Sequence, residues 1–491
     1  MGVYAATAIP VETQSADRLT LGMTLQSEMI SVPGSGRAAW LLELRALVAL
    51  SWPLALSNLA QIGMGTTDLM MMGSLGPDTL AAGALGTNLY FMLMIFGIGL
   101  LNAVSPMIAR ELGRASPRIG EVRKVVQQGL WSAACVAVPC WLILWWSEGL
   151  LLGIGQEPAL AATAGRYVHF LQWALLPSWG YLVLRSFVSA VERPAWALTI
   201  GVAAVGVNAL ANWCLMLGHC GCRPLGIAGS GLATLLSSLL MFAALGVVVY
   251  LAKPFRTYRV FAGVWRPDWP RLRALWRLGL PMAATLSFEV TMFNAAVFLM
   301  GLISAASLAA HSIAIQLSGL SFMVPLGIGQ AVTVRVGRAY GAQDAEAICR
   351  AGWTAVWLEV GFMATMSLGL ILAPRLLISA FLDITDANNA EVIRLAVSFL
   401  VLAALYQIAD GTQAVGSGML RGLHDTRAPM LFALVGYWGI GLPLGMLLAF
   451  PLGFKGIGIW IGLFVGLAVV AVLMIRRWHR REALGLLSPR L

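Results

Sequence analysis

Four acidic side chains stand out because each falls well inside a long apolar stretch of the sequence. They are Asp68, Glu289, Glu359 and Asp410. A charged side chain at the centre of a bilayer costs on the order of 2.5–3.5 kcal/mol on the insertion scale. A proton, a metal ion, a cationic ligand or water would relieve that cost, and burial favours the neutral form of a carboxyl group. Each acid is therefore a candidate for the reversible exchange of one cation for another.

Two of these acids have oxygen-bearing neighbours at helical spacing. Tyr406, Asp410 and Gln413 share one face of a helix, and Thr285 lies one turn before Glu289. Carboxylate, phenol and amide oxygens suit a small hard cation such as Na⁺. We therefore expect a coupling-ion site at Glu289, Asp410 and Tyr406, with Gln413 as a lining residue. The alternative is a protonated acid that only hydrogen-bonds two helices together.

Other polar residues in the apolar segments indicate less specific roles. Glu359 has no polar residue at helical spacing, so a structural hydrogen bond is the favoured interpretation there. Asn208 and Asn212 share one helix face, and they either line a cavity or hydrogen-bond neighbouring helices. No Lys or Arg falls at the depth of the four acids, so we expect none of the acids to have a counter-ion.

The apolar composition defines the elements that must position these side chains. Of 491 residues, 59% are hydrophobic and 11% are charged, whereas soluble domains carry about 25% charged residues. Apolar runs of about 20 residues indicate membrane-spanning helices. We expect an all-α integral membrane protein with twelve such helices, with cores at 46–72, 79–106, 124–146, 161–184, 195–217, 227–251, 278–300, 305–334, 352–373, 395–420, 428–450 and 456–475.

The basic residues predict how the chain is oriented. A net charge of +10 would suit a nucleic-acid partner, but the Lys and Arg residues fall in alternate connections between the expected helices. Of the 32, the five on the other side are Arg166, Arg223, Arg375, Arg394 and Lys455. Basic connections stay in the cytoplasm. We expect a multi-pass protein of the plasma (inner) membrane with both termini cytoplasmic, in contact with the lipid bilayer and not with nucleic acid.

The first half of the chain repeats in the second half at a constant offset. Matched positions include Pro53 with Pro281, Ala55 with Ala283, and Gly99 with Gly327. Each half therefore has six helices, and an even number makes both halves enter the membrane in the same direction. Their pseudo-twofold axis is then expected along the membrane normal, as in several secondary transporters with parallel repeats.

This repeat predicts the domain organisation. The expected parts are a disordered cytoplasmic tail over 1–40, an N-lobe over 41–252, a basic cytoplasmic linker over 253–277, a C-lobe over 278–476 and a cytoplasmic tail over 477–491.

The acids do not follow the repeat. Asp68 matches Ala296, and Glu289 matches Gln61, so the scaffold is duplicated but its carboxylates are not. The asymmetry indicates that the two lobes have different tasks, with Gln61 as a possible lining residue. Two half-chains that rock about a central cavity would expose it to each side in turn.

Several other classes of function lack their motifs. The sequence has no GxxxxGK[ST] loop for a nucleotide motor, no GxSxG elbow and no HExxH helix. We therefore expect no enzyme activity and no cofactor, and transport driven by an ion gradient. His219, Cys220 and Cys222 fall in one expected loop, where a disulfide is favoured over a metal site because their spacing suits tetrahedral ligation poorly.

Three segments resemble one transporter family. "SWPLALSNLAQIGMGTTDLMMMGSLGPDTLAA" resembles the first helix and following loop of the multidrug and toxic compound extrusion (MATE) family, and "LGLPMAATLSFEVTMF" resembles its seventh helix. "LYQIADGTQAVGSGMLRGLHDTRAP" is similar to its tenth helix and the LRG–DT loop. The YxxxD and LRGxxDT patterns resemble the NorM-like branch, and the resemblance runs from about Leu44 to Trp478.

The resemblance implies a V-shaped antiporter with two six-helix lobes that exports organic cations in exchange for Na⁺ or H⁺. Glu289 and Asp410 match the family's C-lobe cation-binding acids, Tyr406 matches the tyrosine beside them, and Asp68 matches the N-lobe acid. We expect a monomer that binds cationic or lipophilic small molecules, with Phe288 and Phe293 lining the cavity.

Two alternatives stay open. One is a lipid-linked precursor flippase on a related two-lobe scaffold, which a lack of basic side chains inside the helices disfavours. The other is a channel. The sequence does not decide between Na⁺ and H⁺ as the coupling ion.

Overall fold

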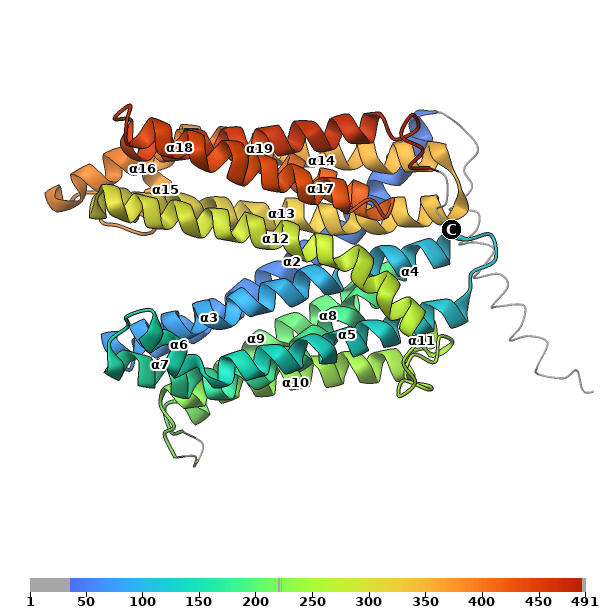
Figure 1. Ribbon diagram of the computed structural model, residues 1–491, viewed down its shortest axis with the longest axis horizontal. Coiled ribbons are helices and arrows are strands. Elements are labelled where there is room, and N and C mark those ends of the chain that lie inside the picture. Colours follow the sequence, from blue (N-terminus) through green and yellow to red (C-terminus); the bar gives the residue numbers. More distant parts are fainter. Residues whose placement is uncertain (1–35, 220, 222, 488–491) are drawn as a thin grey trace, which may run out of the picture.

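A computed structural model describes residues 36–219, 221 and 223–487, and helices dominate this part of the chain (Figure 1). Eleven of the described helices are long and apolar enough to cross a membrane. The twelfth, over 158–190, consists of α7 and α8 separated by a short 3₁₀ turn. The twelve-helix prediction is therefore confirmed, with one crossing broken.

The helices form an N-terminal and a C-terminal bundle, joined by a connection that contains α11 (Lys253–Arg256). The N-terminal bundle contains α2 (Arg37–Gly73), α3 (Pro77–Leu101), α4 (Val104–Gly113), α5 (Ile119–Trp145), α6 (Ser147–Gly153), α7 (Pro158–Leu171), η1 (Gln172–Ala174), α8 (Leu175–Ala190), α9 (Ala195–Leu215) and α10 (Ile227–Leu251). The C-terminal bundle contains α12 (Trp269–Ile303), α13 (Ala305–Ala342), α14 (Ala345–Leu372), α15 (Pro374–Ile378), η2 (Ala387–Asn389), α16 (Ala390–Gly422), α17 (Arg427–Ala433), the π-helical η3 (Leu434–Gly441), α18 (Leu442–Ala449) and α19 (Lys455–His479).

The two bundles approach each other at one end and diverge at the other (Figure 1). The close end holds α11, and we call it the linker end. There α2 starts among C-terminal helices, because Leu47 and Leu54 belong to the C-terminal core. Conversely, Leu275 and Met282 of α12 belong to the N-terminal core. The first helix of each bundle therefore begins in the hydrophobic core of the other bundle.

The contacts between bundles obey the pseudo-twofold relation expected from the repeat. Gly99 of α3 packs directly on the backbone of Ala283 in α12, and Gly327 of α13 packs on Ala55 in α2. An added Cβ at either glycine would collide with that backbone. Residues matched in sequence thus exchange partners across the interface. Small residues are common where membrane helices approach closely, because packing rather than the hydrophobic effect holds such helices together.

Local sequence signals explain several helix starts. Side chains cap α12, α13 and α14: Asp268 accepts a hydrogen bond from Arg271 N at 3.3 Å, and Ser304 and Asp344 cap the next two helices.

Two helices begin earlier than the expected domain boundaries. The helix α12 begins inside the range expected for the linker, and α2 begins inside the range expected for the tail. The remaining tail residues, 1–35 and 488–491, lie outside the described residues, as do Cys220 and Cys222.

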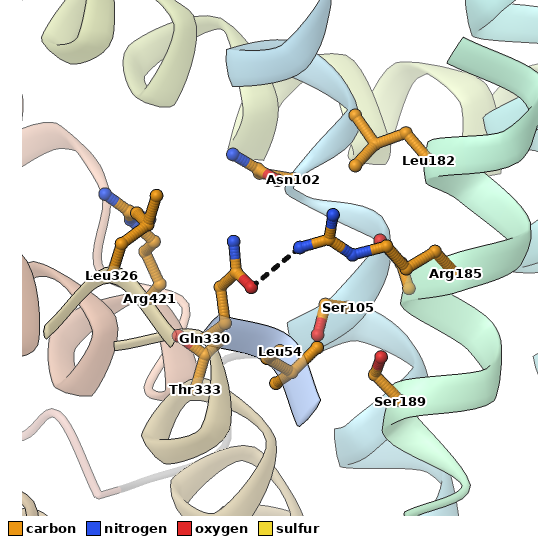
Figure 2. Close-up of a pocket in the computed structure, with 11 residues that line it drawn as sticks. Leu54, Asn102, Ser105, Leu182, Arg185, Ser189, Leu326, Gln330, Thr333 and Arg421 are labelled. Atoms are coloured by element: carbon orange, nitrogen blue, oxygen red, sulfur yellow. Dashed lines mark hydrogen bonds between the residues drawn. The ribbon is translucent and has the colours of Figure 1, made fainter. Parts of the chain in front are cut away.

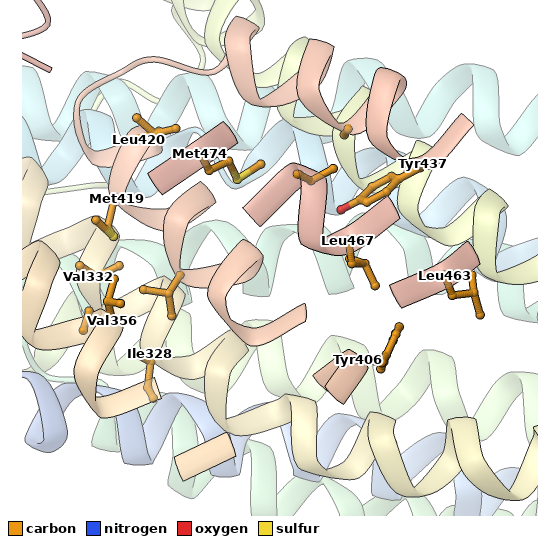
Figure 3. Packing of buried hydrophobic residues seen from close by; sticks show 14 of the residues in the cluster. Ile328, Val332, Val356, Tyr406, Met419, Leu420, Tyr437, Leu463, Leu467 and Met474 are labelled. Carbon is orange, nitrogen blue, oxygen red and sulfur yellow. The ribbon is translucent and has the colours of Figure 1, made fainter. Parts of the chain in front are cut away.

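The C-terminal core supports the acidic residues considered below. Ile328, Val332 and Leu467 pack between α13, α16 and α19, and Tyr406 and Tyr437 lie at the edge of the same cluster (Figure 3). Both tyrosines are almost fully buried. Their phenol groups are therefore held in place by apolar neighbours on several helices.

Candidate functional site

The structure brings together the two C-lobe acids expected to bind a cation. Glu289 on α12 is half-buried, and its Oε2 accepts a hydrogen bond from Gln413 Nε2 at 3.4 Å. Asp410 on α16 is only 5% exposed, and its Oδ1 has no hydrogen-bond partner in the described residues. The two carboxylates are close enough to interact electrostatically. Gln413 of α16 thus links Glu289 of α12 to the helix that carries Asp410.

Tyr406 lies one turn before Asp410, and its hydroxyl interacts with the Asp410 carboxylate. Its ring packs edge-on against Phe293, with centroids 6.3 Å apart, and against Trp460 at 5.5 Å. These rings hold the phenol beside the acid. The expected grouping of phenol, amide and carboxylate oxygens is therefore present as neighbouring side chains.

Glu359 on α14 joins this acidic group from the other side of α16. It is fully buried, Thr412 Oγ1 donates to its Oε2 at 3.1 Å, and its Oε1 has no partner in the described part of the chain. Gly411 permits the approach, because a Cβ there would collide with that Oε1. Thr412 lies on the adjacent helix, so residue spacing within α14 could not predict it as a partner of Glu359. Glu359 is also within electrostatic reach of Asp410.

Asp68, the N-lobe acid, has a different environment. Its Oδ1 accepts from Asn212 Nδ2 at 2.6 Å, and its Oδ2 accepts from Thr234 Oγ1 at 2.8 Å. Asn212 also donates to the Asn208 carbonyl at 3.0 Å, and both asparagines are fully buried. The asparagines predicted as lining or helix-bonding residues therefore surround Asp68 in this structure. Thr234 on α10 was missed, because a threonine in an apolar helix usually bonds only its own backbone.

The remaining predicted lining residues differ in accessibility. Phe288 and Phe293 are half-buried against the C-terminal core, and Gln61 is exposed on α2. The Phe288 carbonyl accepts from Trp438 Nε1 at 3.3 Å, which ties α12 to η3. The aromatic residues thus flank Glu289, whereas Gln61 belongs to the other bundle.

Two arginines contradict the expectation that helix interiors hold no basic side chain. Arg185 in α8 is 4% exposed, and its Nη2 donates to Asn58 Oδ1 at 2.5 Å and to Gln330 Oε1 at 2.9 Å. Arg421 lies in the last turn of α16, within electrostatic reach of Glu289. The expectation was wrong because α8 and α16 extend beyond the predicted cores and carry these arginines into the protein. Figure 2 shows both side chains near a cavity between the bundles.

An ion-pair cluster joins the bundles at the linker end. Arg335 on α13 contacts Glu43 on α2 through Nε at 2.9 Å and Nη2 at 2.6 Å, and it reaches Glu192 at 3.1 Å. Arg338 also contacts Glu192, at 3.2 Å. The sequence predicts that Arg335 and Arg338 lie on the cytoplasmic side. It contains no signal for their pairing with Glu43 and Glu192. Because the start of α2 packs in the C-terminal core, the contacts of Arg335 and Arg338 with Glu192 are the ones that must break if the bundles separate at this end.

Within the described residues, no group of three or more His, Cys, Asp or Glu side chains is arranged to hold a metal ion. The oxygen groups of Glu289, Asp410 and Tyr406 are two carboxylates and a phenol that lie within electrostatic reach of one another. His219 instead stacks on Trp213, with ring centroids 4.4 Å apart.

Comparison with known proteins places the chain in a family. The model of the MatE family matches residues 53–214 and 281–447. A probable multidrug resistance protein NorM from Mesorhizobium japonicum is 61% identical over 446 residues, which cover 91% of this chain and 96% of that relative.

Solved structures agree on the fold. The eukaryotic MATE transporter AtDTX14 superposes with a TM-score of 0.79 at 22% identity, covering 91% of this chain and 98% of that one. An outward-facing multidrug resistance MATE transporter of the MOP superfamily gives a TM-score of 0.79 at 19% identity, covering 90% and 96%. The chain therefore belongs to the MatE family, in its NorM-like branch.

Proposed function

We propose that this chain is a multidrug antiporter that exports organic cations across the plasma (inner) membrane in exchange for Na⁺ or H⁺. The observation that carries this proposal is the pair Glu289 and Asp410. Their carboxylates, on α12 and α16, are close enough to interact electrostatically, and the buried Oδ1 of Asp410 lacks a donor within the described residues. A buried carboxylate is costly without a bound cation or proton.

The two C-lobe acids would hold either the drug or the coupling ion, but not both. An organic cation would be attracted by the charge of Glu289, with Phe288 and Phe293 providing apolar contact. Na⁺ or H⁺ would neutralise the same carboxylates and release the drug, with Tyr406 and Gln413 as neutral oxygen ligands. Na⁺ is favoured for this donor set because it prefers oxygen ligands. A third C-lobe carboxylate, Glu359, would adjust the affinity of Asp410 through its charge.

Two bundles that meet at the linker end support alternating access. The excess of basic residues in alternate connections orients the linker end toward the cytoplasm. In that orientation the ion pairs of Arg335 and Arg338 close the cytoplasmic side, and the diverging ends face outward. Rocking would break these pairs and expose the acids to the cytoplasm. Each positive charge that enters gains about 2.3 kcal/mol per 100 mV.

A lipid-linked precursor flippase stays the second candidate because of Arg185. A flippase of this kind would need basic groups in its interior to hold phosphate, and a buried guanidinium supplies one. The acids that dominate the C-lobe favour cationic cargo instead. Transport of a fluorescent lipid-linked phosphate with no movement of organic cations would support the flippase.

The test uses purified protein in liposomes. Ethidium efflux is measured under an imposed Na⁺ gradient and, separately, under a pH gradient, for the wild type and for Asp410→Asn and Glu289→Gln. We expect both substitutions to abolish ion-coupled ethidium movement. The matched control is Glu391→Gln, an exposed acid at the start of α16, which should transport normally. Normal coupled efflux by Asp410→Asn would overturn the proposal.

A further inference from the structure

A small cavity lies between the bundles, on the linker side of the acids. Its volume is about 50 Å³, enough for one or a few water-sized particles because a water molecule needs roughly 10–15 Å³. Residues of both bundles line it, among them Asn102 and Ser105 from the N-terminal bundle and Gln330 and Thr333 from the C-terminal bundle (Figure 2). The cavity therefore exists only while the bundles are together.

The charge of this cavity is positive. Arg185 of α8 and Arg421 of α16 both line it, with the Arg421 guanidinium beyond Gln330 in Figure 2, and no carboxylate is among its lining residues in the described part of the chain. Asn58 and Gln330 accept hydrogen bonds from Arg185 Nη2, but these are neutral amides. Arg421 has Glu289 within electrostatic reach. Arg185 therefore carries a buried charge that hydrogen bonds satisfy but that no anion neutralises.

We infer that the cavity is a binding site for a small inorganic anion of about the size of chloride. Guanidinium groups, hydroxyls and amide N–H groups are the donors that such an anion needs, and Ser105, Ser186 and Ser189 add hydroxyls. A volume of about 50 Å³ suits an ion of this size. An anion there offsets the cost of burying Arg185, which is large for any unpaired charge.

The position of this site couples the anion to conformation. Arg185 belongs to the N-terminal bundle, and Gln330 and Thr333 belong to the C-terminal bundle, so an anion that binds Arg185 together with these residues holds the bundles together at the linker end. Separation of the bundles divides these donors and destroys the site. A ligand that binds one of two states shifts their equilibrium toward that state. The anion is thus a clamp on the linker-end-closed state, and this inference does not depend on which substrate is transported.

Anion binding to the purified wild type tests the site directly. Melting temperature is followed while chloride replaces gluconate at constant ionic strength. We expect the melting temperature to rise with chloride concentration and then to level off, both for the wild type and for Arg166→Gln. This control changes an exposed arginine on α7. For Arg185→Gln we expect an apparent chloride affinity weaker by at least about tenfold, because a charge-assisted hydrogen bond is lost. No chloride effect in the wild type, or an equal effect in Arg185→Gln, would overturn the inference.

A second measurement keeps the test decisive if Arg185→Gln fails to fold. Crystals of the wild type grown in bromide should give an anomalous peak in this cavity, beside Arg185. A map with no peak there, from crystals in which other bromide ions are visible, would exclude the site. Arg185→Lys keeps the charge as a point cation, so it should retain part of the chloride effect. Complete loss of the effect with normal folding would show that the fork of the guanidinium is required.

Discussion

Removal of the Arg335 guanidinium should release the bundles at the linker end. Arg335 contacts both oxygens of Glu43 and also reaches Glu192. Exposed ion pairs contribute about 0–1 kcal/mol, and loss of one partner from a fully buried pair costs about 3–5 kcal/mol. The side chains of Arg335, Glu43 and Glu192 are 21%, 9% and 25% exposed. We therefore expect Arg335→Gln to destabilise the state in which the bundles meet at the linker end by about 1–3 kcal/mol. The population of this state relative to the separated state should fall by roughly 5–150-fold.

Distances between spin labels report this population. Ser116 follows α4 and Ala342 ends α13, so both lie at the linker end, one in each bundle. With cysteines introduced at these two positions in a chain without native cysteines, the wild type should give one short distance. Arg335→Gln should add a longer distance, and Glu192→Gln should act in the same direction. The double variant should change less than the sum of the two, because both remove one interaction.

The control is a pair inside one bundle. Arg350 contacts Glu346 at 3.7 Å within α14, and the glutamate side chain is 77% exposed. Arg350→Gln removes the same charge near the same end and should leave the distances unchanged. If it shifts them as much as Arg335→Gln, net charge and not the inter-bundle pair controls closure. An unchanged distribution for Arg335→Gln would refute the reasoning altogether.

Two further predictions concern single positions. Gly411→Ala should weaken coupled ethidium transport because its Cβ would displace the Glu359 carboxylate, whereas Gly361→Ala, which meets nothing within 4 Å, should be tolerated. Burial lowers the pKa of His424, in the loop after α16, to about 4, from about 6.5 in an unfolded chain. Stability should thus fall as the pH drops from about 6.5 to about 4, and thermal melts of His424→Gln should show a smaller fall. An identical pH profile for wild type and His424→Gln would contradict this assignment.

The helices were predictable because apolar length and the alternation of basic connections are both local signals. The repeat added a relation between halves, and the reciprocal packing of Gly99 on Ala283 and of Gly327 on Ala55 follows from it. The break at η1 was not predictable, since the apolar run through it is continuous and Pro177 lies only beyond it. The π-helical segment η3 also has no distinct pattern in the sequence.

The candidate site was predictable only in part. Spacing within α16 grouped Tyr406, Asp410 and Gln413, but a single sequence gives no distances between helices. The partners of Asp68 and Glu359 come from other helices, so they stayed hidden. The burial of Arg185 was missed for a related reason: a basic residue near the end of an apolar run looks like a cytoplasmic flank. Only the packing of α13 against α8 places it inside the protein.

The central claim is that the same carboxylates hold either an organic cation or the coupling ion. Its most direct test is equilibrium binding of ethidium to purified protein, titrated with NaCl, with choline chloride at equal ionic strength as the reference, and repeated over a range of pH. We predict that Na⁺ or protons displace ethidium competitively from the wild type, and that Asp410→Asn loses this displacement. Ethidium that stays bound at saturating Na⁺ and at low pH, or that is displaced equally well from Asp410→Asn, would contradict the account.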